Sequence, residues 1–362
     1  MRLHLYLCIM LHDVKTTAIK VNPPSKPATQ GDVAKAAGVS TATVSRVINQ
    51  PDSVRSAIRQ RVQTAIVELQ YVADAAARAL ASKRSRCIGA VIPTLANAIF
   101  ADGIEAFETQ LNQASLSLML TTSGYDSQHE LTQVRTLIER GVDAVMLVGL
   151  DHDPLIYALL QQRKIPYVLT WAYRSDCPHP CVGFNNYEAA KLIPLHLTTL
   201  GHQQFAIISG ISTGNDRAFD RLKGMTDALS SQGITLAQSS IIECNYSIEA
   251  GRAACRQLLR SNSPPTAILC SNDVLATGAL LECQASGIEV PGHVSIAGFD
   301  DLAISANLTP SLTTMHIPFK LMGQRAAQYL IDRLAGATPQ AQQKLEVELR
   351  LRHSTAPPKL AL

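Results

Sequence analysis

The chain has 362 residues, 46% of them hydrophobic, and a formal net charge of +3. A chain of this length and apolar content buries large cores, which excludes a disordered protein, a mini-protein and a disulfide knot, and indicates two or three domains. No apolar run reaches the roughly 18 residues that a transmembrane helix needs. Residues 1–27 carry +3, residues 28–87 carry +5 and residues 88–362 carry −5. We therefore expect a polyanionic partner at the basic end.

Residues 1–27 precede the first predicted helix. Leu3 to Leu11 form an apolar run behind Arg2 that weakly resembles a signal peptide, but the run is short and no small-x-small cleavage site follows it. Residues 21–27 are rich in proline and typical of a linker. We expect residues 1–27 to be a disordered extension or the product of a wrongly chosen start codon, with export as the open alternative.

Three short helices are predicted within residues 28–72, the predicted DNA-binding domain. The first carries a capping box and stops at Gly38. The second is capped by Ser40 and runs to about Asn49, and the third spans about 55–69. Two short helices joined at a glycine turn and steadied by a third are typical of a helix-turn-helix unit.

The second predicted helix carries one polar face near its N-terminus, the part of a recognition helix that enters the major groove. Arg46 could bond guanine through two N–H groups, and the methyl groups of Thr41 and Ala42 could touch thymine. The +5 charge favours DNA binding over the solvated surface of a small helical bundle. The candidate DNA contacts of this helix are Thr41, Ala42, Ser45, Arg46 and Asn49.

Residues 32–49 (DVAKAAGVSTATVSRVIN), continued through residues 65–71 and 73–80, resemble the DNA-binding signature of LacI-type bacterial transcriptional repressors. The resemblance implies that residues 73–85 are a hinge helix and linker, and that the hinge helix folds when two subunits meet on a pseudo-palindromic operator. It also implies that Leu80 enters the minor groove, where an apolar wedge unstacks a base step and bends the duplex.

From Cys87 onward, about nine short apolar runs alternate with helical stretches. Continuous apolar strands between helices are typical of parallel sheets covered on both faces. So many strands favour an α/β core of two doubly wound lobes, with a ligand crevice at the carboxyl ends of the strands. The expected core spans 86–362, with lobe 1 at about 86–185 and 316–340 and lobe 2 at about 186–315 and 341–352.

Enzyme motifs are missing from the core. It has no Gly-rich phosphate loop, Walker A sequence, Gly-x-Ser-x-Gly elbow or His-Glu-x-x-His motif, so we expect a binding protein that is not an enzyme and needs no cofactor. The eight scattered cysteines suit a reducing cytosol. Residues 177–181 (CPHPC) offer three metal ligands but no fourth at finger-like spacing, which favours a proline-rich loop over zinc.

Residues of about 86–352 resemble the effector-binding core of the same family, itself similar to periplasmic sugar-binding proteins. The matching segments are residues 201–210, 271–273 and 297–301. The resemblance implies that Arg221 holds the ligand, with Asn272 and Asp300 as polar partners. By residue type alone, Asn272 could merely cap a helix, Asp300 could shape a turn and Arg221 could lie on a helix surface. An arginine with carboxylate and amide partners suits sugar hydroxyls or an acid group.

Four further residues are candidates for the effector cleft. Trp171, the only tryptophan, either stacks on a sugar ring or belongs to the core. The others are Phe100 at the first core helix, Tyr125 after the second strand, and Arg217, one helical turn before Arg221. Residues 122–125 and 182–190 look most like the gluconate-utilisation repressors within the family, which implies a sugar-acid effector; a neutral sugar or a nucleobase is the alternative.

These observations predict an allosteric, cytoplasmic DNA-binding regulator, a repressor that a small ligand controls by shifting the balance between core conformations. The last predicted strand is followed by no heptad repeat, which favours a homodimer over a tetramer. The rival from another class is a secreted sugar-binding protein of a transporter, against which the predicted DNA-binding segment argues.

Overall fold

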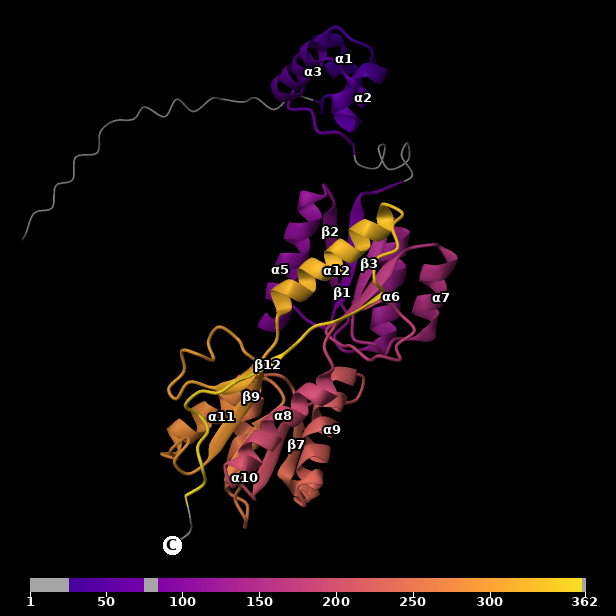
Figure 1. Ribbon diagram of the computed structural model, residues 1–362. Helices are drawn as coiled ribbons and strands as arrows, with labels where there is room; N and C mark the ends of the chain where they lie inside the picture. The colour runs from indigo at the N-terminus through magenta and orange to yellow at the C-terminus, as the bar shows by residue number, and fades with distance from the viewer. Residues whose placement is uncertain (1–25, 75–83, 360–362) are drawn as a thin grey trace, which may run out of the picture. The chain divides into compact units, whose positions relative to one another are not determined.

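The computed structural model describes residues 26–74 and 84–359 (Figure 1), and the chain separates into two units, Met1–Arg78 and Ala79–Leu362. The predicted extension at residues 1–27 lies almost wholly outside the described residues. Most of the predicted hinge helix, including Leu80, lies outside them as well. Within the described residues, no helix is long and apolar enough to cross a membrane.

The first unit contains three α-helices, as the sequence predicted. They are α1 (Gln30–Ala37), α2 (Thr41–Asn49) and α3 (Ser56–Glu68), with a 3-10 turn η1 (Pro51–Ser53) before α3. Thr29 and Asp32 form the predicted capping box of α1. Gly38 ends α1 at φ +62°, where a Cβ would lie 2.7 Å from the Arg61 guanidinium, so the tight turn requires glycine. The small core is made by Val33, Ala34, Ala37, Val44, Val47, Val62 and Ala65.

Lobe 1 is built on a parallel sheet of order β11-β5-β4-β3-β1-β2. Its strands are β1 (Cys87–Ile92), β2 (Ser117–Thr122), β3 (Ala144–Val148), β4 (Tyr167–Thr170), β5 (Cys181–Gly183) and β11 (Gln342–Lys344). Its helices are α5 (Ala98–Gln113), α6 (Ser127–Glu139), α7 (Pro154–Gln162) and α12 (Phe319–Leu334). Alternate strand residues pack under α5 and α12 on one face and under α6 and α7 on the other, which explains the continuous apolar runs.

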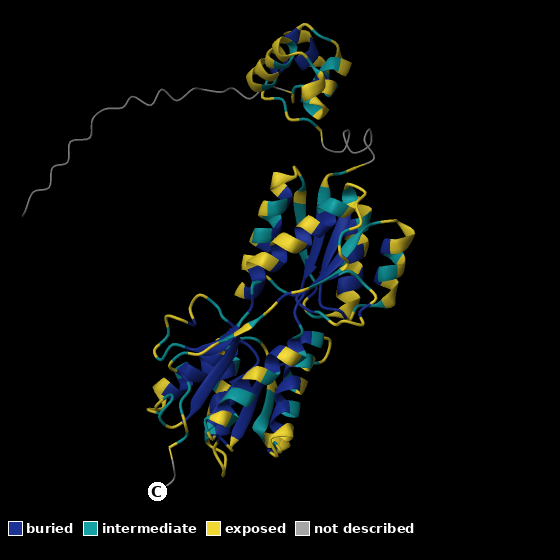
Figure 2. Cartoon of the chain, viewed as in Figure 1, coloured by how far each residue is buried: buried dark blue, intermediate teal, exposed yellow. Residues whose placement is uncertain are grey.

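Lobe 2 is built on a second sheet, of order β12-β10-β9-β8-β6-β7. Its strands are β6 (Phe205–Gly210), β7 (Ile241–Cys244), β8 (Ala267–Cys270), β9 (Ser295–Asp300), β10 (Thr313–His316) and β12 (Glu348–Arg350), of which only β12 is antiparallel to its neighbour. Its helices are α8 (Asn186–Thr199), α9 (Asp216–Ser231), α10 (Ile248–Leu259) and α11 (Asp273–Ala285), with a 3-10 turn η2 (Gln238–Ser240). Figure 2 shows the central strands of both lobes buried beneath helices that expose one side.

The chain passes between the two sheets three times, after β5, after β10 and after β11. The last crossing corrects the expected lobe boundary, because residues 341–344 were assigned to lobe 2. Gln342 instead pairs in parallel with Cys181, which places β11 at the edge of the lobe 1 sheet. The expected strand near the C-terminus shortens to β12. Alternation of residue types predicts a strand but carries no information about the sheet edge it joins.

Candidate functional site

The carboxyl ends of the strands face a cleft between the lobes, as expected for a doubly wound core. The deepest part of this cleft, here called the inner pocket, has a free volume of about 20 Å³. All seven residues that the sequence suggested for the effector line it: Phe100, Tyr125, Trp171, Arg217, Arg221, Asn272 and Asp300. The space suffices for about one water molecule, so a sugar ring enters only if the side chains or lobes move apart.

Arg221, on α9, is the most constrained cation of the inner pocket. Its Nε donates to Asn186 Oδ1 at 2.8 Å, and its Nη1 donates to the Ser271 carbonyl at 2.9 Å and to Asp300 Oδ1 at 3.1 Å. The guanidinium lies 3.8 Å from the ring centroid of Phe299. Only 4% of the residue is exposed, so the alternative of a surface arginine is wrong.

Asp300, at the end of β9, is fully enclosed. Burial raises its pKa from 3.8 to about 7, against the lowering effect of Arg221. Its backbone has φ +120°, a region that residues other than glycine rarely adopt. The carboxylate therefore sits on a strained backbone with a charge balance that a bound group can alter.

Three buried polar atoms of the inner pocket lack a hydrogen-bond partner within the described residues. They are Trp171 Nε1, Asn272 Nδ2 and Asp300 Oδ2, and Ser209 Oγ is the only other such atom there. Asn272 does cap α11, since its Oδ1 accepts from the Leu275 amide at 2.9 Å, but the cap leaves its Nδ2 unpaired. An unpaired buried polar group costs about 1–3 kcal/mol, so three around one pocket point to a missing ligand or water.

Two further lining residues of the inner pocket have a strained backbone. Tyr125 and Trp171 have φ values of +63° and +61°. Trp171 is held by Asn186, whose Nδ2 donates to its carbonyl at 2.9 Å, and by Phe100 at a ring-centroid distance of 5.3 Å. Both predicted roles of Trp171 are compatible with this position, because the ring is buried and also lines the pocket. Strained non-glycine residues cluster at functional sites.

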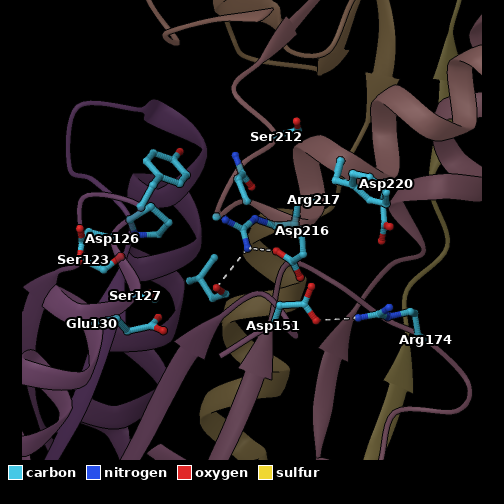
Figure 3. A pocket seen from close by; sticks show the side chains of 16 residues that line it. Ser123, Asp126, Ser127, Glu130, Asp151, Arg174, Ser212, Asp216, Arg217 and Asp220 are labelled. Carbon is cyan, nitrogen blue, oxygen red and sulfur yellow. Dashed lines mark hydrogen bonds and ion pairs between the residues drawn. The ribbon is translucent and has the colours of Figure 1, made fainter. Parts of the chain in front are cut away.

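Arg217 lies where the inner pocket meets a wider chamber of about 380 Å³, shown in Figure 3. We call this the acidic chamber because five carboxylates and two arginines line it: Asp126, Glu130, Asp151, Asp216, Asp220, Arg174 and Arg217. Most of these charges are already paired. Arg217 contacts Asp216 at 2.7 Å, Arg174 contacts Asp151 at 3.1 Å, and Glu130 contacts the His152 ring at 2.8 Å.

Three polar lining residues escaped the sequence analysis, namely Asn97, Asn215 and Tyr246, and so did Asn186, which accepts a hydrogen bond from Arg221. Asn97 and Asn215 line the inner pocket and cap α5 and α9, each directly after the loop that follows a strand. An asparagine at a helix start following a strand was the available signal. No local signal in the sequence marked Asn186 or Tyr246. The role of Asn186 depends on its hydrogen bond with the distant Arg221. The position of Tyr246 depends on Gly210, where an added Cβ would lie 2.1 Å from the Tyr246 ring.

The side chains of residues 177–181 (CPHPC) pack against their neighbours in lobe 1. The His179 ring stacks on Tyr157 at a centroid distance of 3.8 Å, and its Nδ1 lies 2.7 Å from the Tyr167 hydroxyl. Cys177 and Cys181 are buried. Within the described ranges, no group of three or more metal-binding side chains is gathered.

The candidate DNA-reading face lies on α2 in the first unit. Thr41, Ala42, Arg46 and Asn49 are exposed, and Ser45 is half-buried. The amide of Asn49 donates to the carbonyl of Ser45 at 3.0 Å and to its Oγ at 3.3 Å, so these two residues support each other along the helix. Arg46 makes no ion pair with any described residue, which leaves its guanidinium available to a nucleic acid.

Comparison with known proteins links both units to one kind of protein. Residues 29–74 match a family model described as bacterial regulatory proteins, lacI family, and residues 195–355 match a periplasmic binding protein-like domain. The chain is 33% identical to the HTH-type transcriptional regulator DegA of Bacillus subtilis over 341 residues, which are 90% of this chain and 97% of DegA. It is 30% identical to the HTH-type transcriptional regulator GntR of Escherichia coli K12 over 305 residues, 84% of this chain and 91% of that protein.

A solved structure shares the whole architecture. The lac repressor dimer bound to operator and the anti-inducer ONPF matches with a TM-score of 0.81 and 30% identity, covering 91% of this chain and 100% of that chain. The similarity therefore includes the small helical unit as well as the two-lobed core.

Proposed function

The chain belongs to the lacI family of bacterial regulatory proteins, and from that premise we propose that it is a homodimeric repressor controlled by a sugar or sugar acid bound in the inner pocket. It is a DNA-binding transcriptional regulator of a family whose matched members are regulators rather than enzymes. A binding role for the core follows, and a transporter's secreted sugar-binding protein would have no use for the helix-turn-helix unit.

The observation that carries the effector proposal is the set of unpaired polar atoms beside Arg221. Trp171 Nε1 and Asn272 Nδ2 are donors, and ionised Asp300 Oδ2 is an acceptor. A sugar hydroxyl both donates and accepts, so a polyhydroxylated ligand satisfies this mixture. Arg217 and Arg221 favour a carboxylate on that ligand, which is why we put a sugar acid of the gluconate type before a neutral sugar or a nucleobase.

Allosteric control follows from the small volume of the inner pocket. A pyranose ring does not fit the space of about 20 Å³, so the lining side chains or the lobes must move apart when it binds, and we infer that the ligand favours a core conformation with a wider lobe separation. A ligand that binds one conformation better shifts the population toward it. We propose that this shift is transmitted through residues 73–85, with Leu80 as the minor-groove wedge that the family resemblance implies.

Two measurements on the full-length chain test the proposal. Fluorescence anisotropy with operator candidates should show sequence preference and a steep loss of affinity with rising salt. Thermal unfolding with gluconate, glucose and hypoxanthine should show the largest stabilisation with gluconate. Sequence-independent DNA binding would refute the repressor role, whereas stabilisation by glucose or hypoxanthine alone would replace only the effector.

A further inference from the structure

A second chamber lies beside the inner pocket. It lies between the loop after β1 and the loops after β6 and β7, and its volume of about 650 Å³ is within the usual range for small-molecule sites. None of its fourteen lining residues is charged. We call it the uncharged chamber; Leu95, Thr122, Ile211, Thr213 and Asn245 are the lining residues on which the argument depends.

The uncharged chamber adjoins the inner pocket. Asn97, Tyr125, Asn215 and Tyr246 line both spaces, so a molecule held at Arg221 could extend directly into the chamber. The inner pocket alone is far too small for a ligand with two rings, whereas the chamber could hold a second ring in the present conformation.

The chamber offers uncovered apolar side chains from both lobes. Leu95 is 65% exposed and Ile211 is 45% exposed, although each lies at the mouth of a cleft. Large aliphatic side chains exposed together at a cleft mark a binding surface. Around them, the side chains of Thr122, Thr213 and Asn245 make no hydrogen bond with any described residue. Apolar contact surrounded by neutral hydrogen-bonding groups suits a pyranose ring, which has C–H faces and a hydroxyl rim.

The acidic chamber is a poorer place for such a ring. Asp151, Asp216 and Glu130 are engaged by Arg174, Arg217 and His152, so an incoming hydroxyl must compete with existing partners. A second carboxylate on the ligand would also meet five acidic side chains there. Neither obstacle exists in the uncharged chamber.

We propose that the effector has two parts: a polyhydroxylated head in the inner pocket and a neutral glycosyl ring in the uncharged chamber. This proposal rests on the proposed function, and it specifies in addition that the effector has two rings' worth of length and two chemically different ends. It predicts that a glycosylated sugar acid binds more tightly than the bare sugar acid, because the second ring covers Leu95 and Ile211.

The test compares matched ligands by isothermal titration of the full-length chain. The pairs are gluconate with maltobionate (glucosyl-gluconate), and glucose with maltose. The two-ring member of at least one pair should bind about tenfold or more tightly than its one-ring partner, the gain expected from burying roughly 60 Å² of apolar surface. Equal or tighter binding of the one-ring members would overturn the inference and leave the proposed function standing. Failure of all four ligands to bind would overturn this inference together with the proposed gluconate-type effector, whereas the repressor role is tested separately by the DNA-binding measurement.

Variants locate the second ring. Leu95→Ala and Ile211→Ala should each reduce the preference for the two-ring ligand several-fold and leave one-ring affinity unchanged. Leu155→Ala, at a similarly exposed leucine on α7 outside the cleft, is the matched control and should change neither. If Asp220→Asn removes the preference and the Leu95 and Ile211 variants do not, the ring occupies the acidic chamber and the inference is wrong.

Discussion

Arg217, on α9 of lobe 2, donates a hydrogen bond of 3.1 Å from Nη1 to the carbonyl of Val148 at the end of β3 in lobe 1. The adjacent Asp216 accepts from the Leu150 amide at 2.7 Å. The start of α9 is therefore tied to lobe 1 beside the effector pocket. Under the proposed allosteric control, a wider lobe separation would lengthen or break these two bonds, so they would link the inner pocket to the core conformation.

Gly149 makes this tie between the lobes possible, and its substitution should weaken it. At φ +107°, an added Cβ would lie 2.3 Å from Arg217 Nη1. We expect Gly149→Ala to lower the free energy of unfolding by about 1–3 kcal/mol and to weaken effector binding. Gly141→Ala is the matched control, because its φ is +75° with no atom within 4 Å of the added Cβ. If urea unfolding shows the same loss of unfolding free energy in Gly149→Ala and Gly141→Ala, backbone strain alone explains the effect and the contact with Arg217 does not contribute.

The buried carboxylate of Asp300 should make stability depend on pH. Its pKa is raised from 3.8 to about 7, so between these values the folded chain keeps a proton that the unfolded chain has lost. The contribution of this carboxyl to stability is then fully present below about pH 4 and is lost as pH rises through this window, an effect on the order of 4 kcal/mol. Asp300→Asn should flatten the curve. Asp273, whose pKa burial raises to about 6, and Asp220, whose pKa burial also raises, would contribute to the remaining slope. An unchanged pH profile of urea unfolding would contradict this account.

The single tryptophan should report effector binding. Trp171 lines the inner pocket and its Nε1 has no partner among the described residues, so a bound ligand changes its surroundings directly. We expect a saturable change in intrinsic fluorescence on addition of the effector. Trp171→Phe should weaken binding about tenfold if Nε1 donates to the ligand. Calorimetric binding with no change in fluorescence would place the ligand away from this ring.

Asn272 has two separable tasks, a helix cap and an unpaired amide. Asn272→Ser keeps a side-chain oxygen that can cap α11 but removes the Nδ2 donor, so we expect stability to change by less than about 1 kcal/mol and effector affinity to fall about tenfold. Asn185→Ser, at the cap of α8, is the matched control and should leave affinity unchanged. If effector affinity is unchanged in both variants, Asn272 only caps α11 and does not contact the effector.

Arg46 should contribute to operator specificity. Arg46→Ala is expected to weaken operator binding by about 1–3 kcal/mol and to relax the preference at one base pair. Arg135→Ala, at an exposed arginine on α6 of the core, removes the same charge and should have little effect. Anisotropy titrations with a panel of single-base operator variants check both results. If Arg46→Ala instead lowers the affinity for all operator variants by the same factor, Arg46 contacts the DNA phosphates and does not read a base.

Local signals in the sequence predicted the helices and strands well, because each signal acts over a few residues. The capping box at Thr29 and the glycine turn at Gly38 are examples. The family resemblance suggested Arg221, Asn272 and Asp300 as ligand contacts, and four further residues were weaker candidates for the same cleft. The structure brings all seven together around the inner pocket. Asn186 and Tyr246 were missed because neither local periodicity nor a cap distinguishes them from ordinary polar residues.

By itself the sequence determined the modular plan: a basic helix-turn-helix unit, parallel strands buried on both faces, and the polar residues that end those strands. Tertiary structure decided which sheet received β11, that Arg217 reaches across to Val148, and that the cleft divides into an acidic and an uncharged chamber. The physical reason is range. Helix caps and strand alternation depend on neighbours a few residues apart, whereas a strand register, an inter-lobe hydrogen bond and a cavity depend on the packing of segments far apart in the chain.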